Sequence, residues 1–130
     1  MQSWEQLFHF FGLRGFKVID QNFSPQAFGN FYYTFSNGQI VFQIIQDRSQ
    51  MILEVGFAKD NDEWFSISLI QAFLQNKMNI EISNSIDSKV LFLMENFNII
   101  VEMFSEKNYQ KSKQKLNEHH KKSSYHYPWQ

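Results

Sequence analysis

The chain contains no cysteine. This absence excludes disulfide bonds and thiolate metal sites, and it agrees with a reducing compartment. Long apolar runs are missing as well, and none approaches the roughly 20 residues that a membrane-spanning helix needs. Residues 1–6 lack the basic start, apolar run and small-residue cleavage site of a signal peptide. We therefore expect a soluble, cytoplasmic protein with no membrane partner.

The sequence also lacks the common signatures of catalysis. Its glycines do not cluster ahead of a helix, as a phosphate-binding loop requires, and it contains no Gly-x-Ser-x-Gly elbow. A helix would point the adjacent His119 and His120 to different sides, and no carboxylate accompanies them at ligand spacing. We expect no enzymatic activity, no cofactor and no metal site.

What the sequence does contain is a predicted β-meander over residues 28–57. Residues 28–35, 40–46 and 51–57 alternate in polarity and are separated by two turns. The first turn contains Asn37-Gly38, a strong hairpin signal because both central residues of a type I′ turn need a positive φ. The second turn is expected at residues 47–50.

Alternation with a period of two places one side of each strand against the rest of the chain. The positions expected to face the core together are, strand by strand, Phe31, Tyr33 and Phe35; Ile40, Phe42 and Ile44; and Met51, Leu53, Val55 and Phe57.

Helical spacing of apolar residues predicts further elements around this meander. They are helices over residues 4–13, 62–75 and 88–104, a strand starting at residues 16–20, a loop at residues 24–27 and a short edge strand at residues 78–83. The expected fold class is α+β: an N-terminal helix, an antiparallel β-meander sheet of three to five strands, and C-terminal helices packed on one sheet face.

Charge divides the chain into two parts, although the net charge is only −1. Residues 1–104 hold six Lys and Arg against eleven Asp and Glu, whereas residues 105–130 hold six Lys against two Glu. We expect residues 1–104 to form a single domain. Residues 105–130 are expected to form a basic, solvated helical extension with an aromatic C-terminal tail, in which Tyr109 and Leu116 alone could continue a packed stripe.

One stretch of the chain carries a resemblance to a known family. It runs through Ser24-Pro-Gln-Ala-Phe-Gly-Asn30, an aromatic strand, an apolar strand, Asp47-Arg48-Ser49-Gln50 and a third strand to Glu63-Trp64, which is expected to open an amphipathic helix. This stretch, residues 24–74, resembles small α+β immunity proteins of bacterial contact-dependent growth inhibition and polymorphic toxin systems. The resemblance implies a non-catalytic protein that binds and neutralises a cognate toxin domain in the cytoplasm.

Charge supports the same hypothesis independently. Toxin domains that act on nucleic acid, such as nucleases, tend to be basic, and an acidic surface would associate with them rapidly. The residues expected to contact the toxin are six exposed acids and two aromatic anchors: Asp20, Asp60, Asp62, Glu63, Glu81 and Asp87, with Tyr32 and Trp64. Each acid taken alone could instead be a solvated surface charge, and those at positions 60, 62 and 63 could cap the following helix.

Two other functions remain open. The chain could be a general interaction adaptor or chaperone-like module, whose alternating Tyr125, Tyr127 and Trp129 dock on a partner's sheet edge. It could also bind nucleic acid through its Lys-rich tail, which the acidic body disfavours. In the latter case, deletion of residues 105–130 should abolish binding. A homodimer is also possible.

Overall fold

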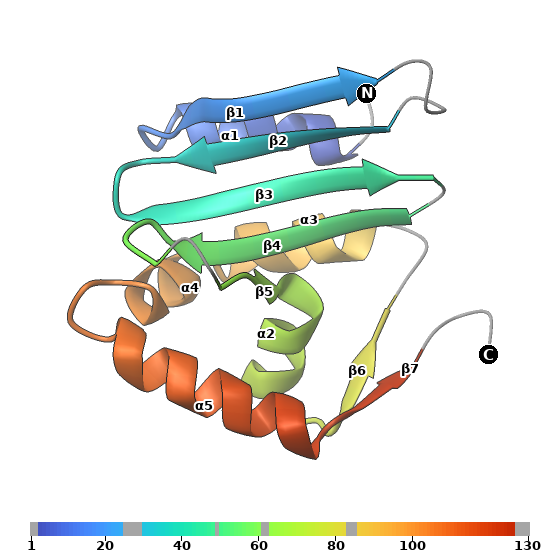
Figure 1. Ribbon diagram of the computed structural model, residues 1–130, viewed down its shortest axis with the longest axis vertical. Coiled ribbons are helices and arrows are strands. Elements are labelled where there is room, and N and C mark those ends of the chain that lie inside the picture. Colours follow the sequence, from blue (N-terminus) through green and yellow to red (C-terminus); the bar gives the residue numbers. More distant parts are fainter. Residues whose placement is uncertain (1–2, 25–29, 49, 61–62, 83–85, 127–130) are drawn as a thin grey trace.

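The structure is a computed structural model, and it describes residues 3–24, 30–48, 50–60, 63–82 and 86–126. Five strands form one antiparallel sheet in the order of the sequence (Figure 1): β1 Lys17–Ser24, β2 Asn30–Ser36, β3 Ile40–Asp47, β4 Gln50–Phe57 and β5 Phe65–Ser66. The α+β class and the antiparallel meander are therefore confirmed.

The helices precede and follow this sheet. They are the 3₁₀ helix η1 Ser3–Glu5, α1 Gln6–Gly12, α2 Ile67–Leu74, α3 Asp87–Glu95, α4 Phe97–Met103 and α5 Tyr109–Lys122. Two short strands, β6 Asn79–Glu81 and β7 Ser124–His126, pair in parallel as a separate sheet. The segment predicted as an edge strand is thus a strand, but it pairs with the C-terminal segment and not with the meander.

The register of the meander confirms the predicted core face. Phe35 lies opposite Phe42, which in turn lies opposite Val55, and all three are buried. Phe42 also lies in an aromatic cluster with Phe11, whose ring centroid is 4.9 Å away, and with Phe97 at 5.9 Å. Burial of such rings supplies most of the favourable free energy of a core of this size.

The Asn37-Gly38 turn forms where predicted, but not as a turn with two positive φ angles. Gly38 has a φ of +93°, whereas Asn37 is not among the described residues with a positive φ. The side-chain oxygen of Asn37 instead accepts hydrogen bonds from the backbone amides of Gln39 and Ile40, each 3.0 Å long. An Asn side chain can stabilise a turn in this way without adopting the left-handed conformation itself.

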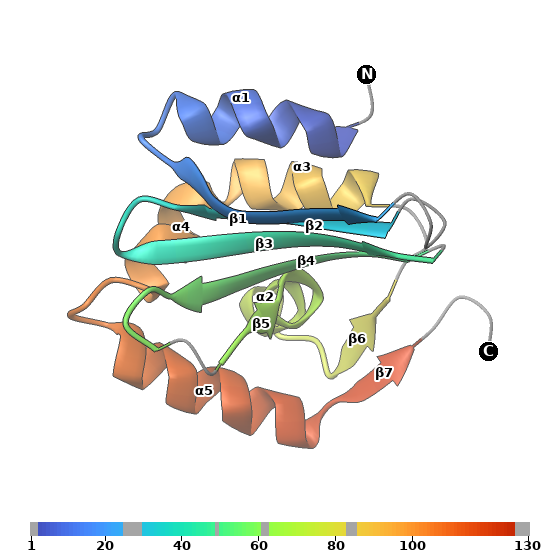
Figure 2. The same cartoon turned by 45° about the horizontal axis from the view of Figure 1, so that its top comes forward.

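Helices cover only one face of the large sheet. Figures 1 and 2 together place α1, α3 and α4 on one side of β1–β4, while α5 runs beyond the edge formed by β4 and β5. In the part of the chain that the structure describes, no helix crosses the opposite side of β1–β4 in either view. The predicted packing of C-terminal helices on one sheet face is confirmed.

Two predicted helices have different bounds. The helix expected over residues 62–75 begins only at Ile67, because Phe65 and Ser66 pair with β4 and the Ser66 hydroxyl accepts a 3.1 Å hydrogen bond from the amide of Leu69. The helix expected over residues 88–104 is divided at Asn96, whose side chain donates to the carbonyl oxygen of Phe92 at 2.9 Å. Ser and Asn side chains compete in this way with regular helical hydrogen bonding.

The Lys-rich segment is helical as expected, but it is not a solvated extension. Tyr109, Ser112, Leu116 and His119 lie on one side of α5 and are all buried. The ring of Tyr109 stacks on Phe57 of β4 at a centroid distance of 4.5 Å. Tyr109 and Leu116, the two residues expected to continue a packed stripe, belong to the same hydrophobic core as the sheet.

Candidate functional site on the uncovered sheet face

The uncovered face of the sheet consists of the strand positions that alternate with the core positions. The register places them in three rows across the strands: Asn22, Tyr32, Ile45 and Ile52; Asp20, Thr34, Gln43 and Glu54; and Lys17, Ser36, Val41 and Gly56. We call these twelve residues the uncovered face. It combines carboxylates, amides and apolar side chains, and it holds two of the residues predicted to bind a partner, Asp20 and Tyr32.

Asp20 and Tyr32 are joined on neighbouring strands. The Tyr32 hydroxyl donates a 3.3 Å hydrogen bond to Oδ2 of Asp20. Desolvation and the adjacent negative charge of Asp20 raise the pKa of Tyr32, so the phenol remains a neutral donor at physiological pH. An irregular register in β1 between Val18 and Asp20 turns Asp20 toward this face.

Trp64 lies at the edge of the same face, and a glycine makes room for it. A Cβ atom added to Gly56 would lie 3.5 Å from Cε3 of Trp64, 3.2 Å from Cγ2 of Val41 and 3.1 Å from the carbonyl oxygen of Glu63. Because Gly56 has no side chain, the backbone of Glu63 and the half-buried ring of Trp64 can approach the strand. The predicted anchor Trp64 is therefore fixed against the sheet.

Asp60 and Glu63 serve first to hold α5 in place. Oδ2 of Asp60 accepts hydrogen bonds from the Tyr109 hydroxyl at 2.7 Å and from Nζ of Lys113 at 3.0 Å, and Lys113 also pairs with Glu63 at 3.5 Å. Burial and the charge of Asp60 raise the pKa of Tyr109, and the hydrogen bond to Asp60 raises the pKa of Lys113. The expectation of an exposed Asp60 is wrong, since its side chain is only 24% exposed.

The capping alternative is also wrong for Asp60 and Glu63, because α2 begins at Ile67 with Ser66 as its cap. Asp62 lies outside the described residues. Two acids of this run, Asp60 and Glu63, thus pair with Lys113 within the protein, and their contact with a partner stays a prediction.

Glu81 and Asp87 lie away from the uncovered face. Glu81 is in β6, where its charge counteracts the burial that lowers the pKa of Lys89. Asp87 begins α3 on the covered side of the sheet and accepts a hydrogen bond from the Ser3 hydroxyl. The structure thus joins Asp20 to Tyr32, and it places Asp60, Glu63 and Trp64 near the edge of the sheet. It separates Glu81 and Asp87 from both groups.

A cavity of about 350 Å³ lies between the sheet edge and α5, and sequence reasoning missed most of its polar lining. Its walls include Glu54, Glu63, Trp64, His120 and Tyr125. The hydroxyl of Tyr125 and Nδ1 of His120 share a 2.6 Å hydrogen bond. The alternation of β4 could have marked Glu54 as a carboxylate on the non-core side, but the sequence contains no sign that α5 returns beside it.

The two adjacent histidines diverge as expected. Nε2 of the buried His119 donates a 2.7 Å hydrogen bond to the carbonyl oxygen of Lys77, whereas His120 faces the cavity. Among the described residues, no three His, Asp or Glu side chains converge closely enough to hold a metal ion. Within the same residues, no helix has both the length and the apolar character needed to cross a membrane.

Comparisons of this chain with known proteins found no match. No protein-family model matches it, and neither a curated protein nor a solved structure was found that matches it.

Proposed function

We propose that this protein is a non-catalytic immunity protein that binds a basic toxin domain, such as a nuclease, in the cytoplasm and neutralises it. The observation that carries the proposal is the uncovered face of the sheet. An antiparallel sheet commonly packs one face on the core and leaves the other accessible, so this second face is available to a partner. Here the second face carries the exposed side chain of Ile52 and the aromatic ring of Tyr32 in one row, and aromatic side chains are enriched in protein-binding surfaces.

One row of this face suits a protein partner. Ile45 and Ile52 lie directly opposite one another on β3 and β4, and Ile52 is 36% exposed. Tyr32 continues the same row on β2, and Trp64 lies at the edge near Gly56. Large aromatic side chains beside small apolar areas commonly contribute most of the binding free energy of an interface.

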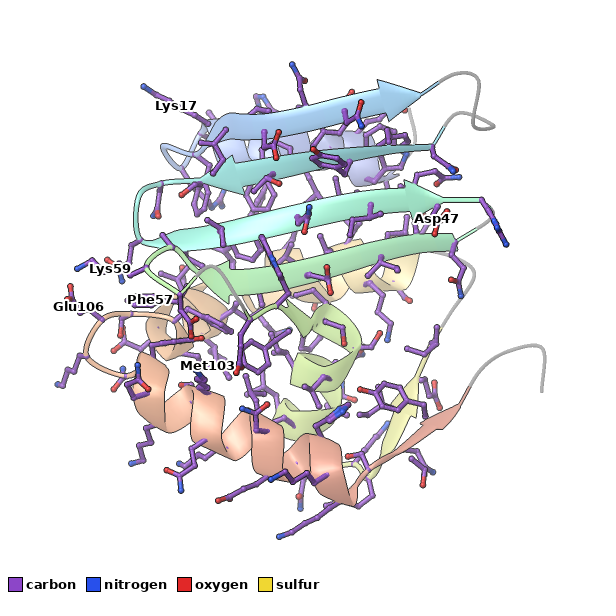
Figure 3. All side chains as sticks on the ribbon, in the orientation of Figure 1. Lys17, Asp47, Phe57, Lys59, Met103 and Glu106 are labelled. Atoms are coloured by element: carbon purple, nitrogen blue, oxygen red, sulfur yellow. The ribbon has the colours of Figure 1, made fainter. Side chains whose placement is uncertain are left out.

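Charge on this face favours a basic partner. Asp20 and Glu54 lie in its middle row, and Asp47 lies at the end of β3, away from Lys17 at the start of β1 (Figure 3). Carboxylates beside an apolar row accelerate encounter with a positively charged partner and disfavour an acidic one such as nucleic acid.

The other candidate functions receive less support from the geometry. Tyr125 lies in β7, one edge of which already pairs with β6 within the protein, so only the other edge could pair with a partner's sheet. Tyr127 and Trp129 lie outside the described residues. Lys113 is neutralised by Asp60 and Glu63, which reduces the positive charge that α5 could present to nucleic acid.

The experiment is co-expression with the toxin-like domain encoded beside this gene, scoring host growth and co-purification together. Deletion of residues 105–130 is unsuitable as a control, because it would remove the buried Tyr109 and Leu116. A sharper pair is Ile52→Lys on the uncovered face and Leu91→Lys on α3, where Leu91 is 57% exposed on the covered side of the sheet. Both place a lysine at an exposed apolar position.

We expect the wild type and Leu91→Lys to restore growth and form a stable complex, and Ile52→Lys to lose both. If Leu91→Lys alone loses growth rescue and complex formation, the interface lies on the helical side of the sheet. No rescue and no complex with the wild type would refute the immunity proposal.

A further inference from the structure

The cavity beside Trp64 is lined by a carboxylate that has no hydrogen-bond or ion-pair partner among the described residues. Glu54 lies in the middle row of the uncovered face and lines the 350 Å³ cavity. It is half-buried, yet no hydrogen bond or ion pair from the described residues reaches its side chain. Burial raises the pKa of Glu54, and no neighbouring cation or donor offsets that effect. Partial burial of a charge without a partner costs free energy, so Glu54 is suited to a partner that comes from another molecule.

The other walls of the cavity define what kind of partner fits. Glu63 adds a second carboxylate, which Lys113 neutralises only in part at 3.5 Å. Trp64 contributes an aromatic ring, and Asn117 and Tyr125 contribute polar groups. A planar cation can stack on an indole ring while it donates two hydrogen bonds to one carboxylate.

We propose that this cavity receives an arginine side chain of the toxin domain, with its guanidinium group paired to Glu54 and stacked on Trp64. The inference rests on the proposed function and specifies how the partner is recognised. An arginine in this position would act as the buried charged anchor that protein interfaces often place near aromatic side chains.

A metal ion and a lysine fit the cavity less well. The described residues offer no cluster of three metal-ligating side chains. A lysine ammonium is strongly hydrated and binds as a point charge, whereas a guanidinium is weakly hydrated, flat and suited to bidentate pairing. The combination of one unpaired carboxylate and one indole therefore favours arginine.

The test uses argininamide, which carries the guanidinium without a carboxylate, and the full protein without its partner. Binding is followed by the shift of the Trp64 indole N–H resonance in NMR spectra, assigned with Trp64→Phe because the chain has 3 tryptophans. The variants are Glu54→Gln, which keeps the shape and removes the charge, and Glu95→Gln on the exposed surface of α3 as the matched control.

We expect saturable binding by the wild type and by Glu95→Gln, and affinity at least tenfold weaker in Glu54→Gln. Lysinamide should bind more weakly than argininamide. The inference is overturned if argininamide leaves the Trp64 resonance unchanged, if Glu54→Gln binds as well as the wild type, or if lysinamide binds equally well.

Failure of this inference can be distinguished from failure of the proposed function. If the toxin domain binds the wild type and Glu54→Gln with equal affinity, the arginine anchor is refuted and the immunity function stands. If the toxin domain binds neither protein while argininamide still binds at Glu54, the cavity recognises a guanidinium and the immunity function is refuted.

Discussion

The hydrogen bond between Tyr109 and Asp60 should make a measurable contribution to stability. Tyr109 is 1% exposed, and its hydroxyl donates at 2.7 Å to a carboxylate that is itself only 24% exposed. Hydrogen bonds to charged groups contribute about 1.5–3 kcal/mol. Because Asp60 would keep Lys113 as a partner, we expect Tyr109→Phe to lower the free energy of unfolding by about 1.5 kcal/mol, near the bottom of that range.

The assay is urea unfolding at pH 7, and two further variants calibrate it. Tyr109→Ala also removes the ring that stacks on Phe57, so it should cost about 3–5 kcal/mol. Tyr33→Phe serves as the matched control, because no hydrogen bond from the described residues reaches the hydroxyl of Tyr33, and it should change stability by less than about 0.5 kcal/mol. If Tyr109→Phe falls within that same margin, the network does not hold α5 and the reasoning is refuted.

Three further predictions follow from single residues. The raised pKa values of Tyr109 and Lys113 mean that their stabilisation is complete below about pH 10 and is lost as the pH rises further. The free energy of unfolding in urea should therefore fall less between about pH 9 and pH 11 in Tyr109→Phe than in the wild type. The raised pKa of Glu54 has the same sign, so ionisation above its ordinary pKa of 4.5 costs stability. Glu54→Gln should therefore be more stable than the wild type at pH 7 and similar to it at pH 4; a less stable Gln variant at pH 7 would show that the carboxylate has a partner. Gly56→Ala should cost about 1–2 kcal/mol in urea unfolding and shift the Trp64 indole resonance, and an unchanged resonance would contradict the close packing.

The sheet could be predicted because the residues that determine each strand and turn lie close together in the sequence. Ile40, Phe42 and Ile44 alternate with polar or smaller neighbours, and pairing two such strands across a short turn fixes which side is buried. The break at Asn96 and the late start of α2 at Ile67 were missed because each depends on one side-chain hydrogen bond to the backbone. Apolar periodicity alone does not report such competition.

The packing of α5 was missed for a different reason. Its buried side includes Ser112 between Tyr109 and Leu116, and His119 after Leu116, so the apolar stripe is interrupted by polar residues. The contact that fixes the helix joins Asp60 to Lys113, 53 residues away. A single sequence does not specify which of several acids meets which of several lysines at such a separation.

The same packing changes how the charge division of the chain should be interpreted. Asp60 and Glu63 belong to the acidic body and Lys113 to the basic segment, and they neutralise one another where α5 meets the sheet edge. Lys113 thus neutralises part of the negative charge that would otherwise attract a basic partner. Glu54 differs, because it is desolvated without a cation and disfavours folding when it is ionised. Residues that reduce stability in this way are often retained for binding, and this is why Glu54, and not the more conspicuous run of acids at residues 60–63, is the carboxylate on which partner recognition should depend.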